Sequence, residues 1–141
     1  MPVSVAQFAH VRLTVTDITA SRAFYEAVFG FPVVLEAPAA DADDATKEQL
    51  AFLFGGVIYS FAGGLLGLRP VAVPGDRYDE NRVGLDHLCF SLDSRADLDH
   101  AVTVLDKLGI PHSGVKNVGG PCILEFRDPD NIALEFTAPA E

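Results

Sequence analysis

Two stretches of similar sequence decide the fold: HVRLTVTD at residues 10–17 and HLCFSLD at residues 87–93. Each begins with a histidine, alternates apolar and polar residues, and ends at an aspartate, which is typical of a half-buried strand. An amphipathic stretch follows each one and ends in a glycine with a proline two residues later, Gly30-Phe31-Pro32 and Gly109-Ile110-Pro111. The glycines are 109 − 30 = 79 residues apart and the histidines 87 − 10 = 77. Repetition at so long a period predicts two copies of one supersecondary unit.

Both amphipathic stretches carry the end signals of helices. Asp17 or Thr19 can cap the first helix, and Ser94 followed by Asp97 resembles a capping box for the second. A glycine ends each stretch, and the proline beyond it prevents the helix from continuing. Because each helix is apolar on one side only, we expect each to cover one face of a sheet.

Strand patterns follow each helix. In the first copy the predicted strands are Val33 to Glu36, Gln49 to Phe54 and a segment within Val57 to Val71, with Ala37 to Glu48 as an acidic loop or short helix. In the second copy they are Val115 to Val118, Cys122 to Arg127 and Asn131 to Thr137. Asp128-Pro129-Asp130 is a strong turn signal between the last two. Each copy is therefore expected to be βαβββ. The fold class is α+β, a single domain over residues 1–141 with module one at 5–73, a linker at 74–82 and module two at 83–139.

Composition narrows the classes of function. The chain has 141 residues, 10 Lys and Arg against 20 Asp and Glu, and a net charge of −10, and 49% of its residues are hydrophobic. This is a globular composition whose acidity argues against nucleic acids and anionic membrane surfaces as partners. The two cysteines form no CxxC motif. No secretory signal or bilayer-spanning apolar run is evident, so a cytoplasmic protein is expected.

Three polar residues on predicted strands could form a metal site. Side chains alternate along a strand, so His10, His87 and Glu135 each fall on the polar face of a strand whose other face is apolar. Two imidazoles and a carboxylate can hold a divalent ion and leave coordination positions open for a substrate. A strand histidine can also be purely structural, but two histidines at equivalent places in a repeat favour a shared site. The ligand set accepts Fe, Mn, Zn, Ni or Co without distinguishing among them.

Other side chains on these polar faces are candidates for a substrate pocket. Arg12 and Thr14 share the face of His10, Cys89 shares that of His87, and Thr137 shares that of Glu135. Arg12 could bind a substrate carboxylate or phosphonate, or it could instead pair with a carboxylate such as Glu125.

Two further histidines are not assigned to the site. His100 lies off the apolar stripe of the second helix, so its side chain should face solvent. His112 follows that helix, and we identify no partner for it.

The repeated pattern and the ending RDPDNIALEF at residues 127–136 resemble the vicinal oxygen chelate superfamily. That superfamily includes glyoxalase I, extradiol dioxygenases, fosfomycin-resistance enzymes and bleomycin-resistance proteins. The resemblance implies two βαβββ modules whose mixed sheets curl around a metal-binding cavity. It also implies that His10, His87 and Glu135 match the family's metal positions, and that the chain forms a homodimer.

The resemblance is incomplete at one strand. Four-ligand members such as glyoxalase I supply a Glu or Gln from the last strand of the first module, which here reads FAGGLLGLR at residues 61–69. We therefore expect a metal-dependent enzyme that binds a small molecule through neighbouring oxygens, of dioxygenase or lyase/transferase type. The alternative is a metal-free, acidic protein that sequesters a ligand, as bleomycin-resistance proteins do. Metal analysis distinguishes the two.

Overall fold

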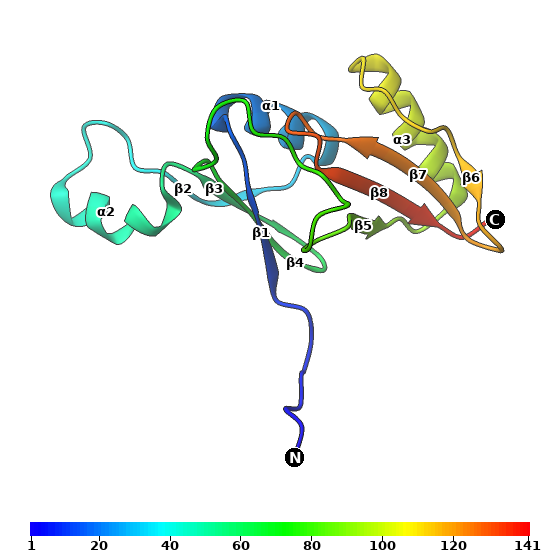
Figure 1. Ribbon diagram of the computed structural model, residues 1–141, viewed down its shortest axis with the longest axis horizontal. Coiled ribbons are helices and arrows are strands. Elements are labelled where there is room, and N and C mark those ends of the chain that lie inside the picture. The colour runs from blue at the N-terminus through cyan, green and yellow to red at the C-terminus, as the bar shows by residue number, and fades with distance from the viewer. The chain divides into compact units, whose positions relative to one another are not determined.

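The computed structural model describes residues 1–141, and the chain divides into two compact units, Met1–Asp76 and Arg77–Glu141 (Figure 1). The first unit contains, in order, β1 (His10–Thr14), α1 (Ile18–Phe29), β2 (Val33–Glu36), α2 (Asp44–Gln49), a 3₁₀ turn (Ala51–Leu53), β3 (Val57–Phe61) and β4 (Gly64–Arg69). Its sheet has the order β1-β4-β3-β2, in which β1 is parallel to β4 and the other pairs are antiparallel.

The second unit repeats this topology. It contains β5 (Leu88–Ser91), α3 (Arg95–Lys107), β6 (Lys116–Asn117), β7 (Cys122–Arg127) and β8 (Ala133–Ala138). The sheet order is β5-β8-β7-β6, with β5 parallel to β8 and the other pairs antiparallel. The predicted α+β class and the two βαβββ modules are therefore confirmed.

Helices α1 and α3 begin and end at or close to the capping residues and glycines that the sequence indicates. Asp17 accepts hydrogen bonds from the backbone N–H groups of Thr19 and Ala20 and caps α1. Gly30 ends that helix in the left-handed region, at φ 63°, which an L side chain seldom adopts. Ser94 accepts from the N–H of Asp97 and caps α3, as predicted.

One predicted strand is wrong. The strand predicted over Gln49 to Phe54 is absent, and α2 and the 3₁₀ turn occupy this stretch. Asp43 caps α2 by accepting from the N–H of Thr46, so a local capping contact sets the helical conformation here. The sheet still has the four strands predicted, because the segment within Val57 to Val71 contains both β3 and β4.

Each helix covers the apolar face of its own sheet. In the first unit, where α1 contacts β4, Leu13, Tyr59, Leu66 and Leu68 are buried under it together with Tyr25 of α1. In the second unit α3 contacts β7 and β8, and the core holds Leu98, Leu105, Leu124, Leu134 and Phe136. The opposite face of each sheet carries polar side chains, such as Arg12 and Glu135, together with apolar ones, such as Leu65. No helix of the chain combines the length and the apolar character needed to cross a bilayer.

Candidate functional site

A row of polar side chains crosses the open face of the second sheet. Cys89 of β5 is in register with Glu135 of β8, and Glu135 is in register with Glu125 of β7. Partners in register point to the same face, so these three side chains lie side by side on the face opposite α3. His87 is two residues before Cys89, immediately before β5, and reaches the same face.

His87 and Glu135, two of the three residues expected to be metal ligands, lie close together. Nε2 of His87 is 3.8 Å from Oε2 of Glu135. On the other side of the ring, Nδ1 donates to Oδ1 of Asp86 at 2.6 Å. The hydrogen bond with Asp86, and after it the negative charge of Glu135, raise the pKa of His87 above its usual value. Asp86 thereby fixes the ring so that Nε2 points towards Glu135.

The negative charge of Glu135 has little positive charge near it. Its side chain is only 14% exposed, and His87 is the one basic group within ion-pair distance of it. Glu125, directly across the ladder, adds a second negative charge, although Nζ of Lys116 binds that carboxylate at 2.6 Å. Partial burial, followed by the hydrogen bond with Glu135, raises the pKa of the Cys89 thiol to about 12. This part of the face therefore favours a cation.

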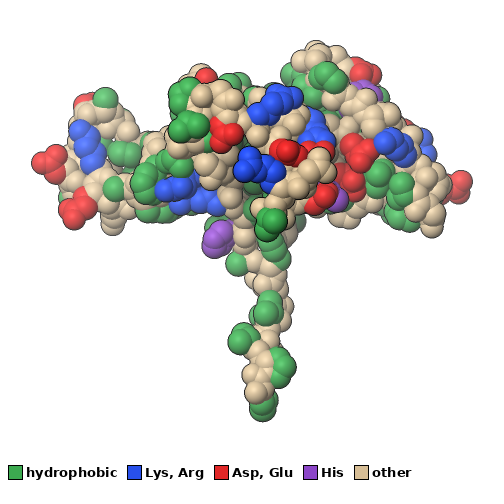
Figure 2. Space-filling model, viewed as in Figure 1, with side chains coloured by type: hydrophobic (Ala, Val, Ile, Leu, Met, Phe, Trp, Pro, Cys, Tyr) green, Lys and Arg blue, Asp and Glu red, His purple; other side chains and the backbone are tan.

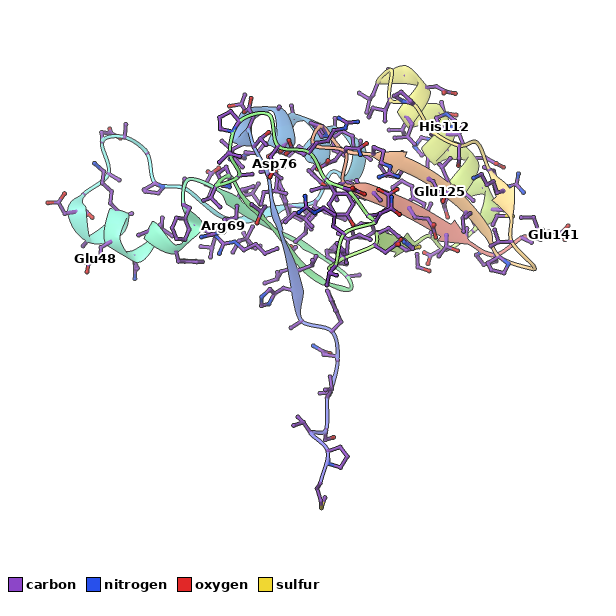
Figure 3. The ribbon with its side chains drawn as sticks, in the orientation of Figure 1. Glu48, Arg69, Asp76, His112, Glu125 and Glu141 are labelled. Carbon is purple, nitrogen blue, oxygen red and sulfur yellow. The ribbon has the colours of Figure 1, made fainter.

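The face is hollowed at this place. A cavity of about 210 Å³ is lined by charged side chains from the loop before β5 and from β7 and β8: Glu80, Asp86, His87, Glu125, Arg127 and Glu135. Glu80 and Arg127 form a double ion pair there, with Nη2 2.6 Å from Oε1 and Nη1 3.0 Å from Oε2. Figure 3 labels Glu125 on β7, among the side chains of this face.

The first unit carries the remaining predicted residues on the open face of its own sheet. His10, Arg12 and Thr14 are exposed, whereas Leu13 between them is buried, so the predicted alternation of β1 is confirmed. Arg12 donates from Nη2 to the carbonyl of Phe52 at 2.6 Å. The structure forms no group of three His, Cys, Asp or Glu side chains that could hold a metal ion. It brings together two of the three predicted ligands, His87 and Glu135.

Gly67 is the topological counterpart of Glu135 in the first unit. Arg12 follows His10 by two residues, as Cys89 follows His87, and Arg12 is in register with Gly67 as Cys89 is with Glu135. The position at which a fourth ligand would stand therefore has no side chain. The sequence showed that this strand lacks a ligand, and the register identifies the residue.

The structure also places the remaining residues of the sequence analysis and adds one that was missed. Thr137 is half-buried, and its hydroxyl donates to the carbonyl of Cys122 at 3.2 Å. His112 does have partners: Nε2 is 2.7 Å from Oδ1 of Asp106, and Nδ1 accepts from the N–H of Gly114 (Figure 3). His100 is exposed as expected. Asp86 was missed, and the only signal for it was an acidic residue directly before a candidate ligand.

The sequence profile of the Glyoxalase/Bleomycin resistance protein/Dioxygenase superfamily matches residues 7–136. The chain belongs to this superfamily. The match spans both modules, so the resemblance seen in the repeated pattern is confirmed. None of the curated proteins compared with the chain matches it.

Solved structures share the fold over almost the whole chain. A glyoxylase/bleomycin resistance protein/dioxygenase domain from Frankia sp. EAN1pec is 29% identical, with a TM-score of 0.76 over 98% of this chain and 95% of that one. A lactoylglutathione lyase from Agrobacterium tumefaciens is 24% identical, with a TM-score of 0.68 over 96% and 95%. The fosfomycin resistance protein FosX from Listeria monocytogenes, in a mutant complexed with Mn(II) and 1S,2S-dihydroxypropylphosphonic acid, is 16% identical, with a TM-score of 0.72 over 97% and 95%. The last two show the fold alone.

Proposed function

We propose that this member of the superfamily is a metal-dependent enzyme that acts on a small molecule, with His10, His87 and Glu135 as the ligands of one divalent ion. The observation that carries the proposal is the pair formed by His87 and the weakly compensated Glu135 on the open face of the second sheet. His10 is included because it stands at the position equivalent to His87 in the repeat.

The two ligands of the second unit fit a metal ion. Two ligand atoms about 2.1 Å from the same ion lie about 3 to 3.5 Å apart, depending on the coordination angle. The 3.8 Å between Nε2 and Oε2 is close to this spacing and needs only a small side-chain adjustment. The hydrogen bond from Nδ1 to Asp86 leaves Nε2 for the metal, which is how histidine ligands are usually oriented.

The ion, when bound, supplies a Lewis acid that stabilises negative charge on a substrate oxygen. Residues of this chain orient the ligands and attract the ion. Asp86 holds the His87 ring, and Glu135 supplies the negative charge that attracts the ion. The cavity of about 210 Å³ next to this pair, lined in part by Glu80, Arg127 and Glu125, would place a small substrate beside the ion.

Metal uptake tests the proposal, and the ladder provides a matched control. Glu135→Gln should lose binding of added Mn(II) or Fe(II), because the amide removes the anionic ligand. Glu125→Gln alters the same residue type directly across the register and should keep it. Both variants are measured by elemental analysis after dialysis, alongside the wild-type chain. Full occupancy in Glu135→Gln, or no uptake by the wild type, would reject the proposed site.

We also propose, from the sequence, that the chain forms a homodimer and that it is located in the cytoplasm. Dioxygenase and lyase/transferase chemistry both remain compatible with this ligand set. The metal-free, ligand-sequestering alternative has only the net charge of −10 in its favour.

A further inference from the structure

Two arginines on the open face of the first sheet lack a carboxylate partner. Arg12 of β1 is in register with Gly67 of β4, and Arg69 follows Gly67 by two residues, so the two arginines are diagonal neighbours on one face. Neither forms an ion pair. This is unexpected in a chain with twice as many acidic as basic residues. In Figure 2 basic side chains gather over this part of the first unit, between α2 and β1.

Residues 52–54 contact both guanidinium groups and hold them in place. Nη2 of Arg12 donates to the carbonyl of Phe52, and Cζ of Arg69 lies 4.3 Å from the ring centroid of Phe54. A carbonyl and an aromatic ring orient a guanidinium without neutralising its charge. Two positive charges therefore converge on residues 52–54, and most of their N–H donors remain available.

Gly67 makes this arrangement possible. A Cβ at Gly67 would lie 3.0 Å from Cγ of Arg12, because the arginine stem runs across the glycine. The missing side chain at the counterpart of Glu135 thus gives room to a cation where the second unit has an anion. In the first unit the stem of Arg12 passes over Gly67, and in the second unit the position equivalent to Gly67 carries the carboxylate of Glu135.

We propose that Arg12 and Arg69 form a binding site for a small anion with two or more oxygens, a carboxylate or a phosphonate. A guanidinium presents paired N–H donors that match two oxygens of such a group, and two adjacent guanidinium groups repel one another until an anion separates them. Both arginines and the residues that hold them belong to the first unit, so binding of the anion does not depend on the proposed metal site.

The test is a titration of the metal-free, full-length chain with methylphosphonate and with acetate, followed by NMR chemical shifts. Arg12→Gln and Arg69→Gln should each weaken binding of the better ligand by about tenfold or more. Arg82→Gln is the matched control, because that arginine is exposed and forms no ion pair. Arg12→Lys should bind the anion with an affinity between those of the wild type and Arg12→Gln, since lysine keeps the positive charge but lacks the paired N–H donors of a guanidinium. Unchanged thermal midpoints establish that the variants are folded.

The outcomes separate this proposal from the metal site. No binding by the wild type, equal affinity in the arginine variants, or equal weakening in Arg82→Gln would overturn it. Metal uptake is measured on the same variants and should be unchanged, because neither arginine is a proposed ligand. If Glu135→Gln keeps its metal while the arginine variants lose the anion, the metal site fails and the anion site stands.

Discussion

At the scale of single residues, Gly56 is the position at which one added methyl group should cost most. A Cβ there would lie 1.9 Å from the carbonyl oxygen of Leu68 and 2.9 Å from that of Leu53, and both are backbone atoms that cannot move aside cheaply. We expect Gly56→Ala to lower the free energy of unfolding by more than about 2 kcal/mol.

Gly55→Ala is the control for this prediction. Gly55 has nothing within 4 Å of an added Cβ, but its φ of +85° strains an L residue, at a cost of about 1 kcal/mol. Urea unfolding of both variants measures the difference. Equal losses would mean that the close approach of Leu68 to Gly56 does not limit stability.

The candidate site shows which residue contacts follow from sequence. Alternation predicts that His87 and Glu135 lie on polar strand faces, but only the pairing of β5 with β8 brings the two faces side by side. The role of Asp86 could not be predicted, because it depends on the rotation of the imidazole ring. The contact of Arg12 with the Phe52 carbonyl spans forty residues and depends on a 3₁₀ turn where the sequence predicts a strand.

At the scale of elements, the caps should carry measurable stability. Asp17 and Ser94 each accept hydrogen bonds from N–H groups at a helix start that have no other partner. Asp17→Ala and Ser94→Ala should each lower the free energy of unfolding by about 1 kcal/mol. Asp41→Ala, in an exposed loop, should change it little. Chemical denaturation of the three variants is the measurement, and an effect of Asp41 as large as the caps would contradict this account.

The ion pair of Glu80 with Arg127 ties the segment before β5 to β7, and it gives a pH-dependent contribution. The hydrogen bond from Arg127 lowers the pKa of Glu80 to about 2. A carboxyl whose pKa is depressed in the folded state stabilises the fold above its unfolded pKa, about 4.3, and loses that contribution as the pH falls towards 2. The stability difference between wild type and Glu80→Gln should therefore be constant from pH 5 to pH 7 and shrink below pH 4.

Unfolding curves at several pH values measure this difference, with Glu48→Gln on the surface of α2 as the control. Glu48 has no ion pair, so its substitution should show no such pH profile. A difference for Glu80→Gln that is the same at pH 3 and pH 7 would mean that the pair with Arg127 contributes nothing to the fold.

Elements with strong local signals could be predicted, and those without could not. Both long helices have a capping side chain at the start and a glycine of positive φ at the C-cap or one residue beyond it, and these signals act within a few residues of the chain. The stretch 49–54 has an apolar run that fits a strand, but only Leu53 of it is buried. Its conformation is set by the Asp43 cap before it and by the left-handed backbone of Phe54 after it. The sequence predicts one strand within Val57 to Val71, where the structure has the two strands β3 and β4.

At the scale of the whole molecule, the exposed apolar edge of the first sheet bears on assembly. β2 is the last strand in its sheet, so one of its edges has no neighbouring strand. Val33, Val34 and Leu35 are nevertheless 40%, 48% and 42% exposed. Apolar edge strands are normally covered or blunted by charge, since an open edge pairs readily with another chain. This observation supports the expected homodimer.

Sedimentation equilibrium tests that expectation across a range of protein concentrations. The wild type should show the mass of two chains of 15.1 kDa each. Val34 lies at the irregularity in the pairing of β2 with β3 and has no register partner, so Val34→Lys should leave the fold intact and shift the mass towards that of one chain. Val118→Lys is the control, because Val118 is an apolar residue of the second unit with a similar exposure, 52%. A single-chain mass for the wild type at every concentration would exclude the dimer, and a dimer that persists in Val34→Lys would place its interface elsewhere than the β2 edge.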